Sequence, residues 1–209
     1  MDPQLVHLIA ASVTFVGSHF VLSHPLRQAV HNLIGEKGFM GLYSLVALAS
    51  FGWMILAFRA VPAGTPLWDG TGVAPWALAS ILTLLAAVLL TGSFQGNPAL
   101  PDPRARDILA RGPHGVFYIT RHPMMWSMAL WALAHVLIAP TPRVLVLSGT
   151  IAFLALVGAH LQDRKKEALM GPAWQQWEAQ TSFWPSLGGL PQAGNLPRFG
   201  GLVLWLIAT

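Results

Sequence analysis

Residues 73–94, VAPWALASILTLLAAVLLTGSF, decide the fold class, because this stretch contains no charged side chain and is long enough to cross a bilayer. A transmembrane helix needs about 20 predominantly apolar residues. Comparable stretches occur four more times, at residues 4–22, 39–58, 124–140 and 143–160. The sequence therefore predicts an all-α, polytopic membrane helix bundle with five full transmembrane helices. A sixth apolar stretch, 199–208, is too short to span and is expected to form a short C-terminal segment.

The composition supports this fold class. Hydrophobic residues make up 54% of the chain and charged residues only 10%, whereas charged residues are about 25% of ordinary soluble proteins. The length of 209 residues fits a single integral membrane domain, residues 1–209. The chain has no cysteine, which excludes disulfides, thiolate-ligated haem and cysteine-bound iron–sulfur clusters. No basic run is interleaved with aromatic residues, so we expect the lipid bilayer, and no nucleic acid, as a partner.

Lys and Arg are distributed unequally between the two sides of the five predicted spans. One side carries only Arg59 and Arg143. Cytoplasmic loops are enriched in Lys and Arg, so we expect a multi-pass protein of the bacterial inner membrane with a periplasmic N-terminus. The basic residues expected on the cytoplasmic side are Arg27, Lys37, Arg104, Arg106, Arg111, Arg121, Arg164, Lys165, Lys166 and Arg198.

One segment outside the predicted spans, residues 163–180, has a charged start followed by apolar and aromatic residues. We expect it to lie on the inner leaflet as an interfacial element, broken into two short pieces at Pro172. Trp174 and Trp177 are then predicted to belong to the aromatic belt at the inner membrane boundary.

Histidines inside the apolar stretches pose the functional question, because an ionisable side chain in a bilayer is costly and marks a functional site by default. His19 lies near the inner end of the first stretch, and His135 lies well inside the fourth. Two imidazoles on different helices can clamp a haem inside a bundle. Hydrogen bonding between helices and acid–base chemistry are the alternative explanations.

Depth in the membrane does not single out one ligand pair. At 1.5 Å per residue, His19 lies roughly 5 Å, and His135 roughly 16 Å, from the inner ends of their helices. By depth alone, His135 pairs better with His7, and His19 pairs better with His122 or His160. The identity of an axial pair therefore stays open on physical grounds.

The densest group of polar residues is Ile-Thr-Arg-His-Pro at 119–123. Pro123 suits the first turn of a helix, which places Arg121 and His122 near an N-terminus that favours an anion. We expect these two residues to hold a carboxylate or phosphate of a cofactor, or to act as catalytic residues in an acid–base step. Positive-inside anchoring of Arg121 is the alternative. Asp163 is expected to pair with Arg121 or to cap the inner surface.

Short pieces that recur in order along nearly the whole chain are GlySerHis 17–19, ProLeuArg 25–27, IleGlyGluLysGlyPhe 34–39, IleThrArgHisPro 119–123, TrpAlaLeuAlaHis 131–135, AspArgLysLys 163–166, GlyProAlaTrp 171–174, and ThrSerPhe 181–183 with Pro185. With these pieces the chain resembles the NnrU family of bacterial membrane proteins. The resemblance implies a link to denitrification and nitric oxide metabolism. Plant relatives, the zeta-carotene isomerases, are haem b proteins that isomerise a cis double bond, and their proposed axial histidines match His19 and His135. A cysteine proposed there as an alternate ligand matches Ala132, which cannot ligate iron, so the ligand-switching mechanism is in doubt for this chain.

The Arg-His-Pro sequence also resembles, more distantly, isoprenylcysteine carboxyl methyltransferases, which bind S-adenosylmethionine (SAM). Those enzymes usually carry two adjacent glutamates after the last full helix and tyrosines after a glycine. Here the stretch reads AspArgLysLysGlu at 163–167, and Trp174 and Trp177 stand in place of the tyrosines. The departures weaken the case for methyl transfer.

These observations favour an NnrU-family membrane protein that binds haem b through His19 and His135. It is expected to serve nitric oxide metabolism or redox chemistry on a lipophilic small molecule. The alternatives are a zeta-carotene isomerase-like cis–trans isomerase, a SAM-dependent methyltransferase, and a non-enzymatic assembly or sensor protein. The sequence does not fix the substrate or the oligomeric state.

Overall fold

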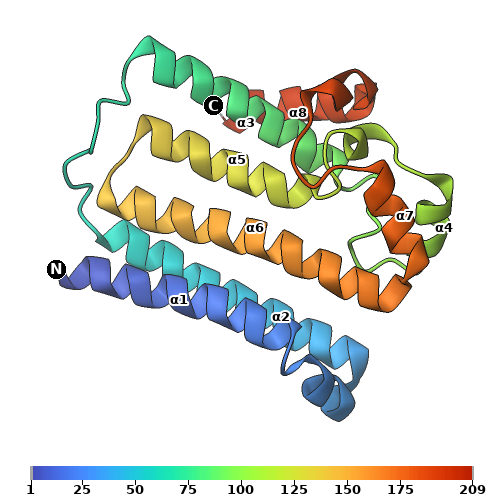
Figure 1. Cartoon of the computed structure of the whole chain (residues 1–209). Helices are drawn as coiled ribbons and strands as arrows, with labels where there is room; N and C mark the ends of the chain where they lie inside the picture. Colours follow the sequence, from blue (N-terminus) through green and yellow to red (C-terminus); the bar gives the residue numbers. More distant parts are fainter. Residues whose placement is uncertain (1, 209) are drawn as a thin grey trace.

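The computed structural model describes residues 2–208, and within this range every regular element is a helix (Figure 1). The prediction of an all-α membrane protein is therefore confirmed. The elements are α1 Pro3–Ser23, α2 Arg27–Ala60, α3 Val73–Gly92, α4 Ala105–Arg111, the 3₁₀ helix η1 Gly115–Tyr118, α5 Pro123–Ile138, α6 Pro142–Met170, α7 Pro172–Gln180, the 3₁₀ helix η2 Leu187–Gln192 and α8 Asn195–Ala208.

Four of the described helices, α1, α2, α3 and α6, are long and apolar enough to cross a membrane. The prediction of five full spans is wrong by one, because α5 has only 16 residues. At 1.5 Å per residue α5 is about 24 Å long, shorter than the roughly 30 Å hydrocarbon core. The 14-residue α8 is the short C-terminal apolar segment that the sequence predicts.

Two helices run further than the apolar stretches that predict them. Helix α6 continues past residue 160 to Met170. It stops at Gly171, whose φ of +57° is a backbone conformation that residues other than glycine rarely adopt. The first part of the expected interfacial element is therefore the end of α6, and α7 is the second part. Helix α2 begins at Arg27 and changes direction at Gly35, where φ is +72°.

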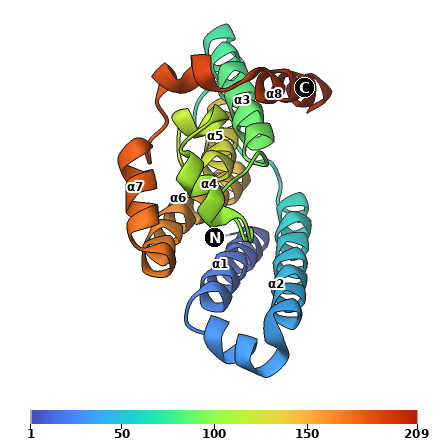
Figure 2. The same ribbon diagram turned by 90° about the vertical axis from the view of Figure 1, so that its right-hand side faces the viewer.

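The long helices pack side by side in the order α3, α5, α6, α1 (Figure 1), with α8 against α3 and α2 against α1. Figure 2 shows α8 and α2 on the same side of this row. Helix α8 packs closely on α3 because Gly201 has no side chain: a Cβ there would lie 2.6 Å from Val88 Cα. The row and its two flanking helices together form a concave face.

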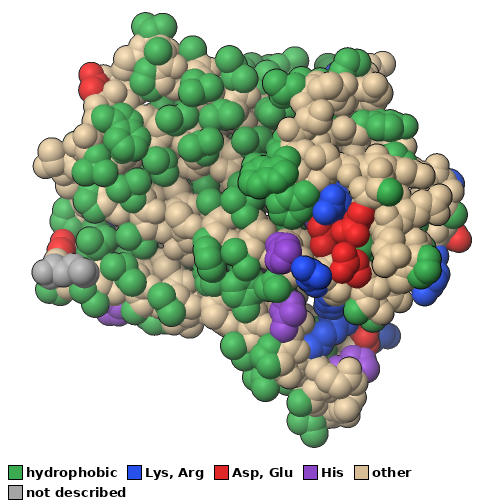
Figure 3. All heavy atoms as spheres, viewed as in Figure 1, with side chains coloured by type: hydrophobic (Ala, Val, Ile, Leu, Met, Phe, Trp, Pro, Cys, Tyr) green, Lys and Arg blue, Asp and Glu red, His purple; other side chains and the backbone are tan. Residues whose placement is uncertain are grey.

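One end of the bundle, formed by α4, η1, α7 and the adjoining end of α6, carries most of the charge, and we call it the polar end. Figure 3 shows Lys, Arg, Asp, Glu and His side chains gathered there, while apolar side chains cover much of the rest of this face. The indoles of Trp174 and Trp177 are 0% and 1% exposed, and Trp177 packs against Phe117 with ring centroids 5.5 Å apart. The prediction that these tryptophans lie in an interfacial belt is therefore wrong, since they form the core of the polar end.

Candidate functional site

The segment before α5 is fixed in place by the chain that follows α7. The Arg121 N–H donates to Ser182 O at 2.8 Å, and the Ser186 N–H donates to Ile119 O at 2.8 Å. The Thr120 hydroxyl donates to Phe183 O, also at 2.8 Å. These bonds hold Arg121 and His122 rigidly at the start of α5, where Pro123 occupies the first turn as the sequence predicts.

Asp163 of α6 accepts hydrogen bonds from both neighbouring residues of that segment. Arg121 Nε and Nη2 donate to Asp163 Oδ2 at 2.9 and 2.8 Å, and His122 Nε2 lies 2.7 Å from Asp163 Oδ1. Their side chains are 14%, 0% and 6% exposed for Arg121, His122 and Asp163. The predicted pairing of Asp163 with Arg121 is confirmed, and the pair is buried rather than on the surface.

Glu178 of α7 completes this cluster on the solvent side. Its Oε1 lies 3.5 Å from Arg121 Nη2. Burial and the nearby Asp163 carboxylate raise the pKa of Glu178, and the charge of Arg121 opposes them. Two carboxylates therefore already surround the Arg121 guanidinium, which leaves little positive charge for the external anion that the sequence suggested.

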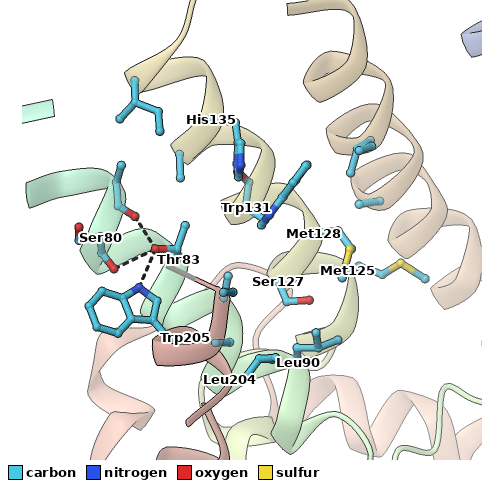
Figure 4. Close-up of a pocket in the computed structure, with 18 of the residues that line it drawn as sticks. Ser80, Thr83, Leu90, Met125, Ser127, Met128, Trp131, His135, Leu204 and Trp205 are labelled. Carbon is cyan, nitrogen blue, oxygen red and sulfur yellow. Dashed lines mark hydrogen bonds between the residues drawn. The ribbon is translucent and has the colours of Figure 1, made fainter. Parts of the chain in front are cut away.

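A large apolar cavity of about 690 Å³ lies on the concave face of the bundle, and we call it the trough. Figure 4 shows Ser80 and Thr83 of α3, Trp131 and His135 of α5, and Leu204 and Trp205 of α8 around it. Trp205 Nε1 donates to the Thr83 hydroxyl at 3.0 Å, which ties α8 to α3 at the wall. The remaining lining residues include Phe15, Phe51, Ala79, Ala86, Ala87, Met125, Met128, Ile138, Ile151 and Leu154.

His135 is the titratable side chain among the residues that line the trough. Its Nδ1 lies 2.8 Å from Trp131 O, one turn earlier, and its ring stacks on the Trp131 indole with centroids 3.9 Å apart. Because a backbone carbonyl only accepts, Nδ1 carries the proton and Nε2 keeps its lone pair. His135 therefore offers a ligating or proton-accepting nitrogen beside an apolar cavity.

His19 of α1 makes the same kind of hydrogen bond as His135, from Nδ1 to the carbonyl oxygen four residues earlier. Its Nδ1 lies 2.6 Å from Phe15 O, and its ring packs against Phe15 and Tyr43, with centroids 4.4 and 5.6 Å apart. Phe15 lines the trough, whereas His19, one helical turn further along α1, is not among the lining residues. Iron-ligating histidines usually donate their second N–H to a carbonyl or carboxylate, so each imidazole fits one axial position of a haem.

His135 lines the trough and His19 does not, and α6 packs against both α1 and α5, the helices that carry these two residues. A shared iron requires the two nitrogens about 4 Å apart, since metal–nitrogen bonds are about 2 Å long. Among residues 2–208, no three His, Asp or Glu side chains gather to hold a metal ion. The pair His19 and His135 stays a prediction, and a haem in the trough fits His135 alone.

The other predicted residues lie elsewhere. Arg121 and His122 do not line the trough, so the structure separates the expected catalytic pair from the expected haem ligands. The His7 ring packs edge-on against Trp53, with centroids 6.1 Å apart, and His160 is exposed.

The trough itself was missed by sequence reasoning, although a signal for it exists. Residues Ala79, Thr83, Ala86 and Ala87 repeat at helical spacing on one face of α3. Small side chains on one face of a helix let a neighbour approach closely or leave a cavity. Only the position of α8 decides between these outcomes, and the sequence does not show where α8 packs.

The helices and the trough define a class: an integral membrane protein with an apolar site between its helices. The chain belongs to the NnrU family, since the family model described as NnrU protein matches residues 7–209. It is also similar to a Zea mays protein, 15-cis-zeta-carotene isomerase, chloroplastic, with 24% identity over 203 residues. That match covers 94% of this chain and 54% of the maize protein, so the chain spans about half the length of this relative. No solved structure matches the chain.

Proposed function

We propose that this NnrU-family protein binds an extended lipophilic molecule in the trough and isomerises a cis double bond in it. The observation that carries the proposal is the trough: a cavity of about 690 Å³ with a nearly apolar lining and one imidazole. Ligand sites of 300–1,000 Å³ with few polar groups are typical of small-molecule binding proteins. The similarity to an isomerase of a polyene hydrocarbon supports this class of substrate.

The dimensions of the trough suit a long, narrow ligand. Its lining runs along α5 from Met125 to Ile138, roughly 20 Å at 1.5 Å per residue. A polyene chain in the trough would lie against Trp131 and His135. It would exchange lipid hydrocarbon for a similarly apolar lining, without loss of hydrogen bonds. Cis–trans isomerisation transfers no atoms, so the site needs to hold the chain and to weaken one π bond temporarily.

The chain's own residues provide the position and the polar group for this step. The Trp131 carbonyl and indole fix the orientation of His135, which lines the cavity and keeps a lone pair on Nε2. We propose haem b as the cofactor, held by His135. When bound, it would supply an iron centre that exchanges electron density with a double bond. Thr83 and Trp205 keep the opposite wall closed.

The test is conversion of 15-cis-zeta-carotene to its trans isomer by the purified protein in lipid nanodiscs, with and without dithionite, measured by chromatography. Ser80→Trp fills the trough, and Ala77→Trp, three residues earlier on the exposed face of α3, is its matched control. We expect conversion by wild type and by Ala77→Trp, and loss of conversion in Ser80→Trp and in His135→Phe. Equal conversion by Ser80→Trp and Ala77→Trp would contradict the proposal.

Haem binding is tested separately by the reduced-minus-oxidised visible spectrum of the purified protein. A haem held by His135 predicts that the spectrum shifts or weakens in His135→Ala, and that His19→Ala changes it only if the two residues share the iron. A colourless protein after expression with a haem precursor would argue against the cofactor and favour SAM binding. A change in neither variant would place the haem elsewhere.

Three further expectations remain proposals. The unequal distribution of Lys and Arg orients the polar end toward the cytoplasm of a bacterium, and the N-terminus lies at the opposite end of the bundle (Figure 1). The link to nitric oxide metabolism rests on the family resemblance. A non-enzymatic assembly or sensor role predicts a stable protein partner and an intact function after substitution of Arg121 and His122.

A further inference from the structure

A second, much smaller cavity lies at the inner end of the trough, and we call it the niche. Its volume is about 10 Å³, close to the size of one water molecule or one hydroxyl group. Met125 lines both cavities, so the niche and the trough meet at this side chain. The residues that line the niche are Asn97, Ala99, Leu100, His122, Met124, Met125 and Gln162.

His122, one of the residues that line the niche, has an imidazole nitrogen that lacks a hydrogen-bond partner. The residue is 2% exposed, and its Nδ1 is buried and makes no hydrogen bond. Its other nitrogen, Nε2, is engaged by Asp163 Oδ1 at 2.7 Å. A buried polar atom left unpaired costs about 1–3 kcal/mol, so its persistence in a buried, rigidly held ring points to a ligand group.

The hydrogen bonds around Asp163 decide which kind of group fits. Arg121 donates twice to this carboxylate, which favours its ionised, acceptor-only form. His122 Nε2 then carries a proton. Because Arg121 already balances the charge of this carboxylate and the His122 side chain is buried, we take the ring as neutral, and Nδ1 then keeps a lone pair. A hydroxyl donates to that lone pair, whereas an aldehyde, a ketone or a hydrocarbon terminus does not.

The wall of the niche opposite α5 is held by two side chains of α6. Gln162 Nε2 donates to Ala99 O at 3.0 Å, and Lys166 Nζ donates to Pro98 O at 2.7 Å. These bonds tie the loop after α3, which also lines the niche, to α6. A group in the trough would reach the niche past Met125, which lines both cavities.

We propose that the niche is a hydroxyl-binding subsite: it takes the terminal hydroxyl of a lipophilic alcohol whose chain lies in the trough, with His122 Nδ1 as acceptor. This inference rests on the proposed binding of lipophilic molecules in the trough. The subsite adds a binding preference that the apolar trough alone does not provide: an alcohol should bind more tightly than a hydrocarbon of equal chain length. It also assigns His122 a binding role distinct from that of His135.

The test compares 1-octadecanol, octadecanal and octadecane as competitors of 15-cis-zeta-carotene, whose co-elution with the detergent-purified protein is followed by absorbance. One net hydrogen bond corresponds to a preference of about 3- to 10-fold. We therefore expect octadecanol to compete about 3- to 10-fold better than the other two compounds. Equal competition by all three would overturn the subsite and leave water as the only occupant of the niche, while the trough would still bind ligand.

Two methionines one turn apart on α5 provide matched variants that leave the bonds to Asp163 intact. Met124 lines the niche and not the trough, whereas Met128 lines the trough and not the niche. Met124→Phe should abolish the preference for octadecanol and leave octadecane competition unchanged. Met128→Phe should weaken all competitors equally. A preference that survives in Met124→Phe would contradict the assignment, and a failure of the carotenoid itself to co-elute would instead contradict the proposed function.

Discussion

Removing the Asp163 carboxylate is expected to destabilise the protein strongly, because three hydrogen bonds from two buried donor residues end on it. Arg121 donates through Nε and Nη2, and His122 donates through Nε2, at 2.7–2.9 Å. In Asp163→Ala the Arg121 guanidinium keeps Glu178, at 3.5 Å, as its carboxylate and lies over the Phe183 ring at 5.5 Å. A mostly buried charge then loses both of its short hydrogen bonds.

The expected loss of unfolding free energy in Asp163→Ala follows from two quantities: the strength of the three hydrogen bonds and the cost of burying the charges. Hydrogen bonds to a charged group contribute about 1.5–3 kcal/mol each, so three of them would suggest about 4.5–9 kcal/mol. Desolvation of the ions offsets part of this sum, and breaking a buried ion pair typically costs about 3–5 kcal/mol. We therefore expect Asp163→Ala to lower the free energy of unfolding by about 3–5 kcal/mol, and Asp163→Asn to lower it by less.

The assay is unfolding in mixed micelles of detergent and dodecyl sulfate, followed by circular dichroism. Asp102→Ala is the control, because Asp102 pairs with Arg104 at 3.2 Å on the surface, where Arg104 is 75% exposed. Such a pair contributes about 0–1 kcal/mol. A loss in Asp163→Ala no larger than the loss in Asp102→Ala would refute the reasoning.

Two other predictions concern neighbouring features. Gly201→Ala should lower the free energy of unfolding by about 1–3 kcal/mol, because the new Cβ would lie 2.6 Å from Val88 Cα. Gly200→Ala is the control, since the nearest atom to its Cβ is 3.6 Å away. Equal melting temperatures for the two variants would contradict the close packing of α8. The pKa of Glu178 is raised in the folded protein, so the folded state binds this proton more tightly than the unfolded state does. The proton therefore stabilises the fold at low pH, and this stabilisation is lost as the pH rises above 4.5, the ordinary pKa of a glutamate. Glu178→Gln should therefore gain stability relative to wild type as pH rises from 4.5 to 7, and a pH-independent difference between the two would argue against this.

Two of the membrane helices, α1 and α3, could be predicted closely because apolar length alone specifies them. Residues 4–22 and 73–94 correspond to α1 and α3 within two residues at each end. The sequence did not show that α5 falls short of a full span. A 16-residue helix is shorter than the hydrocarbon core, so its ends lie at membrane depth and have to be covered by neighbouring parts of the chain.

The site could be predicted only in part. The proximity of Arg121 and His122 follows from adjacency, and the pairing with Asp163 was among the expected outcomes. Their burial was not expected. The Phe183 ring packs on both side chains, and Trp174 and Trp177 are core residues of the polar end instead of facing lipid. The trough and the niche depend on how α8 and the loop after α3 pack, and such long-range contacts leave no local pattern in the sequence.

The central claim is that the trough binds an extended apolar molecule, and co-elution of 15-cis-zeta-carotene with the protein tests it most directly. Wild type and Ala77→Trp should retain the carotenoid through gel filtration in equal amounts, and Ser80→Trp, which fills the trough, should retain little. Equal retention by Ser80→Trp and Ala77→Trp, or no retention by wild type, would contradict the account.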